Sequence, residues 1–334
     1  MNKLKISIIA VILMSAASIA MADAPKRFDF ASAYPENSLI SQAVVDFANN
    51  VKVHSQGKIL ISTHFGGALG YDSRSQYAAA EQGAVDLAQY PMDNLLGLDP
   101  MYELHSLPFI SPSIKDSYEL YKIALPFHEK AFNKANQTIL FSAPFTPQGI
   151  WSKAPIRTIE DLKGLKLRTV EAVSTSVFNK VGATPIQLAW GEVLPALGTS
   201  AISGMVTSDE SGVNAQVWDF GVKYFMPLGY SLGIGVTTMN LDSFERLTAD
   251  EKNMLRKQGK AVEAVAWKRS EDRVAKNRAQ LESKGGKFVE DINPTLMTAL
   301  KAAGAPFVEA WKNKIGADIS GPIFKQYSDI VKKD

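Results

Sequence analysis

The chain has 334 residues, of which 46% are hydrophobic and 21% are charged, and 36 Lys and Arg residues nearly balance 34 Asp and Glu residues. These proportions are those of an ordinary globular protein and exclude a wholly disordered or collagen-like chain. The formal net charge of +2 leaves no broad basic surface for nucleic acid, and the absence of cysteine excludes disulfide bonds, thiolate metal sites and cysteine nucleophiles.

The first 22 residues are typical of a secretory signal peptide. Two lysines precede an apolar run over residues 6–19, and Ala20-Met21-Ala22 supplies the small residues of a cleavage site. The run is shorter than the roughly 20 residues that cross a bilayer as a helix, which disfavours an uncleaved membrane anchor. The pattern therefore predicts that residues 1–22 are removed and that the mature protein is exported to the periplasm.

Strand-like and helical patterns alternate through the first half of the mature chain. The order is strand, helix, strand, helix, strand, which is typical of a parallel α/β sheet. The predicted elements are strands near 28–32, 58–65 and 85–88 with helices over 38–57 and 72–83 between them. The middle of the chain continues in the same way, with helices over 113–135, 174–181 and 192–199, strands near 138–142, 150–152, 165–168 and 204–206, and an extended segment over 225–239.

One long helix is predicted near the C-terminus. Thr248-Ala249-Asp250-Glu251 is a capping box, no proline follows before Ser283, and Gly285-Gly286 is a stop signal. Such a helix is about 50 Å long, which is more than the width of a small domain. It should either cross between two domains or kink near Gly259. Residues 294–314 and 322–333 supply two terminal helices.

No enzyme or metal motif is present. Four histidines, His54, His64, His105 and His128, lack the spacing of metal ligands, and each is interpreted as a surface or packing residue. No nucleophile elbow or phosphate-binding loop occurs, and Gly66–Gly70 is interpreted as a turn. We therefore expect no metal and no cofactor. A pair of catalytic carboxylates stays open, because the many acidic residues offer no distinctive pair.

Several segments in register resemble one protein family. They are Thr158–Arg168 (TIEDLKGLKLR), Val181–Pro185, Trp190–Leu197, Ser55–Ile59, Leu107–Phe109 and the capped long helix. Together they are similar to the solute-binding proteins of tripartite ATP-independent periplasmic (TRAP) transporters, the DctP type. The resemblance implies an α/β, two-lobed periplasmic binding protein fold with a long helix spanning both domains. Domain I is predicted as 23–145 plus about 233–265, domain II as 146–232 plus about 266–334, with the ligand cleft between them.

Arg168 is the leading candidate for the binding site. It ends a short predicted strand, and ligands gather at strand ends in open α/β sheets. Its guanidinium is a planar fork of donors that matches a carboxylate. The resemblance implies that this arginine clamps the carboxylate of the solute.

Other candidates come from the resemblance or from loops after predicted strands. Trp190 is similar to a pocket-lining position, although a core role stays open for it, and Thr207 falls where sialic-acid-binding members carry an asparagine. Tyr230 lies in a segment expected between the domains and presents its hydroxyl to the solute. Loops after the N-terminal strands contribute Ser32, Tyr34, Tyr90 and Asn94.

The departures from the family concern charge. Sialic-acid-binding members have a second arginine where this chain has Gln148, so a monocarboxylate fits better than a dicarboxylate. Asp209 and Glu210 add acidic groups. Either one accepts from a solute hydroxyl or ammonium if it faces the cleft, and neither affects specificity if it faces water.

The predicted function is capture of a small organic anion and its delivery to the small and large TRAP membrane subunits, without catalysis and without nucleic acid. The alternatives are a binding protein of another importer or of a sensor, and a secreted hydrolase or lyase.

Overall fold

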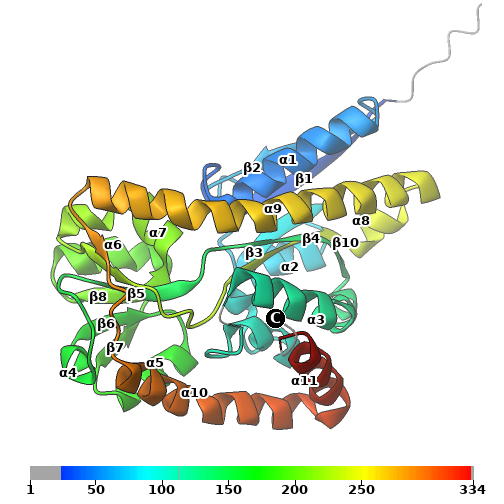
Figure 1. Ribbon diagram of the computed structural model, residues 1–334. Helices are drawn as coiled ribbons and strands as arrows, with labels where there is room; N and C mark the ends of the chain where they lie inside the picture. Colours follow the sequence, from blue (N-terminus) through cyan, green and yellow to red (C-terminus); the bar gives the residue numbers. More distant parts are fainter. Residues whose placement is uncertain (1–23, 112, 332–334) are drawn as a thin grey trace, which may run out of the picture.

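The computed structural model describes residues 24–111 and 113–331, and the predicted signal peptide lies outside them. The first lobe is built on a sheet of order β2-β1-β3-β10-β4 (Figure 1). Its first three strands are parallel, and β10 runs antiparallel between β3 and β4. The strands are β1 (Lys26–Ser32), β2 (Ile59–His64), β3 (Leu87–Pro91), β4 (Gln137–Pro144) and β10 (Ile234–Asn240).

The second lobe is built on a sheet of order β11-β9-β5-β8-β6-β7. Its strands are β5 (Gln148–Ser152), β6 (Lys166–Thr169), β7 (Thr184–Gln187), β8 (Gly204–Ser208), β9 (Tyr224–Met226) and β11 (Lys287–Phe288). Strands β6, β7 and β8 are parallel, so their carboxyl ends lie along one edge. The two sheets confirm the predicted two-lobed α/β architecture. The sequence pattern did not predict the short edge strands β7 and β11.

Helices cover the faces of both sheets (Figure 1). In the first lobe these are α1 (Leu39–His54), α2 (Ser75–Glu81), α3 (Ile114–Lys134), α8 (Leu241–Glu245) and the 3-10 turns η1 (Met92–Leu95) and η2 (Pro100–Ser106). In the second lobe they are α4 (Ile159–Leu162), α5 (Ala172–Lys180), α6 (Trp190–Gly198), α7 (Asp209–Asn214) and η3 (Val217–Phe220). The helices α9 (Ala249–Ser283), α10 (Pro294–Ile315) and α11 (Ala317–Val331) complete the fold.

Two paired segments cross between the lobes. The link from β4 to β5 lies beside the link from β9 to β10, and Phe145 N donates to Gly233 O at 2.9 Å. Further along, Gln148 N donates to Ser231 O at 3.0 Å and Tyr230 N donates to Gln148 O at 3.2 Å. These backbone bonds make the crossing a narrow two-stranded ribbon, which is the natural place for a hinge.

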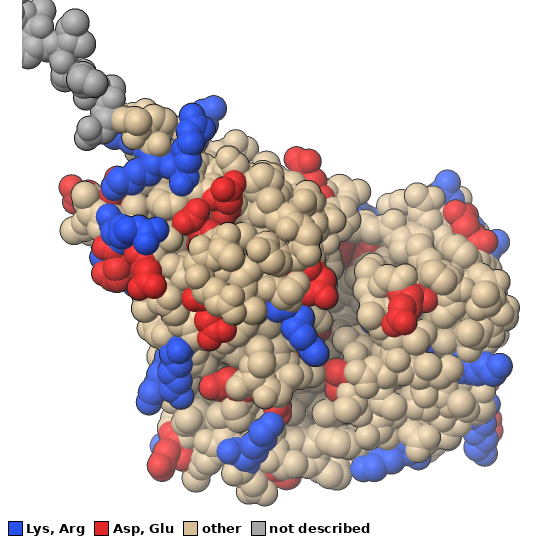
Figure 2. Space-filling model, turned by 180° about the vertical axis from the view of Figure 1, so that it is seen from behind, with Lys and Arg blue, Asp and Glu red and all other residues tan. Residues whose placement is uncertain are grey.

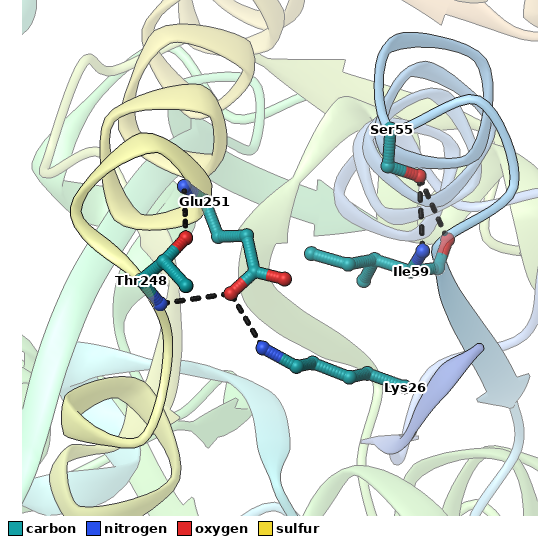
Figure 3. Close-up of polar contacts among 5 residues, drawn as sticks. All are labelled: Lys26, Ser55, Ile59, Thr248 and Glu251. Carbon is teal, nitrogen blue, oxygen red and sulfur yellow. Dashed lines mark hydrogen bonds and ion pairs between the residues drawn. The ribbon is translucent and has the colours of Figure 1, made fainter. Parts of the chain in front are cut away.

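The long helix α9 runs across both lobes as one element of 35 residues (Figure 1). Thr248 N donates to Glu251 Oε2 at 2.8 Å, Glu251 N donates to Thr248 Oγ1, and Lys26 adds an ion pair to the same carboxylate at 2.5 Å (Figure 3). Figure 3 also shows Ser55, whose hydroxyl accepts from Ile59 N where α1 leads into β2. The capping box predicted from sequence is thus confirmed.

Gly259 serves close packing within that uninterrupted helix. A Cβ at this position would clash with the carbonyl oxygen of Leu140 on β4, so only glycine lets α9 approach the sheet so closely. Of the two outcomes predicted from the length of the helix, the structure shows the crossing between lobes.

The C-terminal helices return to the first lobe. The side chains of Trp311, Ile323 and Tyr327 join the core formed by α3 and its neighbours, and Trp311 Nε1 donates to Pro100 O at 2.7 Å. Assigning all of residues 266–334 to domain II was therefore wrong for the end of the chain. The amphipathic pattern of α11 predicts one buried face but does not say which lobe buries it. We propose that domain I includes residues from about 311 onward.

His105 and His128 form a buried pair in the first lobe. Their Nε2 atoms are 3.1 Å apart, between η2 and α3, and both side chains are almost fully buried. Burial lowers the pKa of His128 to about 3, and burial together with the charge of His128 lowers the pKa of His105. Within residues 24–111 and 113–331 no group of three metal-ligating side chains occurs. The interpretation of these two histidines as packing residues agrees with their burial.

The pair should make the protein sensitive to acid. The folded state holds both imidazoles neutral, so their contribution to stability is present above the ordinary pKa of 6.5 and is lost as the pH falls toward the folded pKa. Each histidine should lower the free energy of unfolding by about 1.4 kcal/mol per pH unit below 6.5. The free energy of unfolding of His128→Leu can be measured with denaturant between pH 7 and 4.5. Its fall with pH should have roughly half the slope that the histidine pair gives the wild type. The exposed control His54→Gln should keep the full slope, and an unchanged slope in His128→Leu would contradict the assignment.

Candidate functional site

The two lobes face each other across a groove, which is visible from behind in the space-filling view (Figure 2). The carboxyl ends of β1 and β3 on the first lobe and of β6 and β8 on the second supply the loops at this boundary. In open α/β sheets ligands bind at such edges. The candidate site is assembled from these loops.

Arg168 is a buried cation held by backbone carbonyls. Its side chain is 4% exposed, Nε donates to Leu188 O at 3.0 Å and Nη1 donates to Val206 O at 3.3 Å. It forms no ion pair with any residue that the structure describes. Burial lowers its pKa to about 10, and the charges of Asp93 and Tyr34 oppose that shift. A buried cation without a bonded anion is costly, so the arrangement favours an anion from outside.

Trp190 forms a wall beside this cation. It is the first residue of α6, its ring centroid lies 5.7 Å from the Arg168 guanidinium carbon, and it is 39% exposed. This exposure distinguishes it from the core tryptophans and leaves part of its ring available for contact. A guanidinium over an aromatic face is also held in place by cation–π attraction.

Tyr34 and Asp93 approach Arg168 from the first lobe. The side chains of Ser73 and Asn94 hydrogen-bond to Tyr34, and burial and the charge of Asp93 raise the pKa of its hydroxyl. Burial and the charge of Glu171 raise the pKa of Asp93 to about 6, and the charge of Arg168 acts in the opposite direction. Groups of both lobes therefore interact electrostatically across the groove.

Glu171 is the N-cap of α5 and completes the charged cluster. Its carboxylate accepts from Val173 N and, at 2.7 Å, from Ser174 N, and burial raises its pKa. The sequence analysis did not single out Ser73, Asp93 or Glu171. Asp93 had a usable signal, since it lies two residues after the end of β3 and beside the predicted Asn94.

Gln148 and Thr207 lie on adjacent strands near Arg168. Gln148 pairs with Ser208 and Gly149 pairs with Thr207, while the neighbouring Val206 accepts from Arg168. The side-chain amide of Gln148 is half-buried and makes no hydrogen bond within the described part of the chain. Thr207 is 7% exposed. The structure therefore brings both predicted residues to the edge where Arg168 lies.

Asp209 and Glu210 are buried, which is neither of the two placements considered from sequence. Asp209 accepts from Thr146 Oγ1 and from Glu210 N. Glu210 Oε1 accepts from Asn214 Nδ2 at 2.7 Å and from Leu39 N at 3.2 Å. Leu39 is the first residue of α1, so a carboxylate of the second lobe binds a helix N-terminus of the first, where its charge is favourable.

Three residues that were predicted to bind the solute instead contact other parts of the fold. Tyr90 is fully buried, and its hydroxyl contacts Gln137 and Thr238 in the core of the first lobe. The Ser32 hydroxyl lies 3.4 Å from Ser41 Oγ and accepts from Tyr34 N. Tyr230 packs between Phe109 and Phe178, and its buried hydroxyl has no hydrogen-bond partner among the described residues.

No described helix combines the length and the apolarity that a membrane crossing requires. The family model for bacterial extracellular solute-binding protein family 7, DctP, matches residues 30–314.

Similar solved structures cover nearly the whole chain. DctP7 of Bordetella pertussis, an extracytoplasmic solute receptor binding pyroglutamic acid, is 27% identical with a TM-score of 0.84, and the match covers 91% of this chain and 99% of that one. A marine metagenome TRAP solute-binding protein specific for pyroglutamate is 25% identical with a TM-score of 0.84, covering 92% and 99%.

Two curated relatives are also periplasmic solute-binding proteins. The 2,3-diketo-L-gulonate-binding periplasmic protein YiaO of Escherichia coli is 22% identical, covering 92% of this chain and 87% of the relative. The sialic acid-binding periplasmic protein SiaP of Vibrio cholerae is 28% identical, covering 60% and 62%. These relatives are receptors rather than enzymes, so the hydrolase or lyase alternative is not retained. The chain belongs to the DctP family of extracellular solute-binding proteins, the binding components of TRAP transporters.

Proposed function

We propose that this protein captures a small organic monocarboxylate in the periplasm and holds its carboxylate on Arg168. Members of this family bind small organic acids and work with membrane subunits. The observation that carries the finer proposal is the buried Arg168 guanidinium, which is fixed by two carbonyls and makes no ion pair among the described residues. A carboxylate matches the planar donors of a guanidinium, and it is the anionic group of the small organic acids that this family binds.

The charges around Arg168 favour one carboxylate over two. The charge of Asp93 already acts on the buried Arg168, and the charge of Glu171 acts on Asp93 in turn. The neutral Gln148 adds no positive charge. A second solute carboxylate would meet repulsion and lose hydration without a partner. Two structural relatives, at 27% and 25% identity, bind pyroglutamate. Pyroglutamate is a compact monocarboxylate and is therefore the first candidate to test.

Closure of the lobes would complete the site. We propose that the paired crossing segments act as the hinge and that the closed form docks on the small and large TRAP membrane subunits. Burial on closing strengthens the attraction between Arg168 and the solute because water is excluded. We propose that residues 1–22 direct export to the periplasm and are then removed. Use by another importer or by a sensor is the alternative, and co-purification with the membrane subunits separates the two.

Arg168→Ala should weaken binding without unfolding the protein. Loss of the charged partner of a desolvated carboxylate costs about 2–5 kcal/mol, roughly a 30-fold to several-thousand-fold rise in Kd. Calorimetry with pyroglutamate, or with the organic acid that most raises the melting temperature in a screen, measures this change. Without solute the melting temperature of Arg168→Ala should stay the same or rise, because an unpaired buried cation is removed.

The matched control is Arg157→Ala on the same lobe. Arg157 is an exposed arginine whose ion pair with Asp291 lies at the surface, so its loss should leave Kd unchanged. Equal affinity in the wild type and Arg168→Ala would reject the proposed clamp.

Glu210→Ala should shift the protein toward an open form. Its carboxylate joins α7 to the N-terminus of α1, and a hydrogen bond to a charged group contributes about 1.5–3 kcal/mol. Solute affinity should fall roughly 10- to 100-fold, and small-angle scattering should show a larger radius of gyration. The exposed Glu160→Ala on the same lobe is the control. An unchanged radius and unchanged affinity in Glu210→Ala would show that this contact does not hold the lobes together.

A further inference from the structure

Asp93 is a carboxylate at the lobe boundary that has no side-chain partner among residues 24–111 and 113–331. It lies on η1, directly after β3, and is only partly buried. Its hydrogen-bond donors are backbone amides of its own turn, at Asp93 and Asn94. An ideal Cβ atom built on Gly233 would lie 3.8 Å from Asp93 Oδ2. The Asp93 carboxylate therefore lies close to the crossing segments between the lobes. The carboxylate thus retains accessible acceptor capacity where the two lobes meet.

The neighbouring acidic group is already used by the fold. Glu171 accepts from the backbone amides of Val173 and Ser174 and caps α5. Arg168 and Asp93 are close enough for their charges to interact, yet they form no ion pair with each other. The groove therefore offers unused donors on Arg168 in the second lobe and unused acceptors on Asp93 in the first.

We propose that Asp93 determines specificity by accepting a hydrogen bond from an N–H or O–H group of the solute while Arg168 holds the carboxylate. The solute class is then carboxylates that carry a hydrogen-bond donor close to the carboxyl group. This inference rests on the proposed function and refines it.

The physical reason is the cost of closing the groove over an unmatched carboxylate. A solute without a donor leaves Asp93 desolvated and unpaired, and that penalty counts against binding. Sites built to hydrogen-bond a substrate group reject analogues that lack it far more strongly than sites that only test shape. Asp93 should therefore discriminate between molecules of nearly identical size.

The test compares matched pairs of acids on the full mature chain by calorimetry. The first pair is pyroglutamate and its lactone analogue 5-oxotetrahydrofuran-2-carboxylate, in which the ring N–H is replaced by oxygen. The second is proline and cyclopentanecarboxylate, and the third is lactate and propionate. The wild type should prefer the donor-bearing member of at least one pair by roughly 100-fold or more.

Asp93→Ala should reduce that preference to below roughly 10-fold, chiefly by weakening the donor-bearing acid, while binding of the other member persists or improves. Persistent binding also shows that the variant is folded. Asp93→Asn, which keeps the volume, should lower the preference as well, and the exposed Asp219→Ala should keep it.

No preference in any pair, or the same preference in Asp93→Ala, overturns the inference. Failure of the proposed function gives a different result, because then Arg168→Ala leaves the affinity for every acid unchanged. The two variants therefore distinguish two cases. In one the protein discriminates through Asp93 but not through Arg168, and in the other it binds through Arg168 but does not discriminate through Asp93.

Discussion

The proposed site depends on one constraint, a buried guanidinium that has no anionic partner in the part of the chain that the structure describes. Carbonyl oxygens of Leu188 and Val206 fix Arg168 in orientation but do not neutralise it. The protein accepts the desolvation cost of that charge before any solute arrives. A carboxylate that enters the groove recovers this cost, because it supplies both the charge and the acceptor geometry. In the proposed clamp, affinity comes from preorganisation, since the donors are in place before binding.

In the proposed mechanism, the rest of the fold makes this interaction conditional on closure of the lobes. Two short crossing segments and the helices α9 and α10 connect the lobes. The groups that face Arg168 from the first lobe therefore belong to a separate body. Glu210 at the N-terminus of α1 adds a polar contact between the lobes. A solute that pairs with both lobes favours the closed arrangement, and a ligand shifts an equilibrium only by such differential contacts. Recognition and conformational change are in this sense one event.

Much of this arrangement could be predicted from the sequence, because it depends on local patterns. The alternation of strands and helices predicted the α/β sheets, and the capping box at Thr248 predicted the long helix, while the two-lobed arrangement was implied by the resemblance to the family. Arg168 was found because its strand lies in a recognisable segment. The lobe that buries α11 was predicted wrongly, since an amphipathic helix specifies a buried face but not its partner.

Long-range placement could not be predicted, and it affects the site most. Asp93 looked like any acidic residue after a strand, and only the approach of the second lobe gives it Arg168 and Glu171 as neighbours. Tyr90 was expected in the loop after that strand, but it lies within β3, and its side chain points into the core toward Gln137. Alternation along a strand says that successive side chains lie on opposite faces, but not which face meets a groove.

The most direct measurement of the central claim is a crystal structure of the mature protein with its solute bound. This account predicts a carboxylate whose oxygens lie within about 2.7–3.2 Å of the Arg168 guanidinium nitrogens, with the lobes closed around it. A solute seated elsewhere, with the Arg168 side chain directed into bulk water, would contradict it.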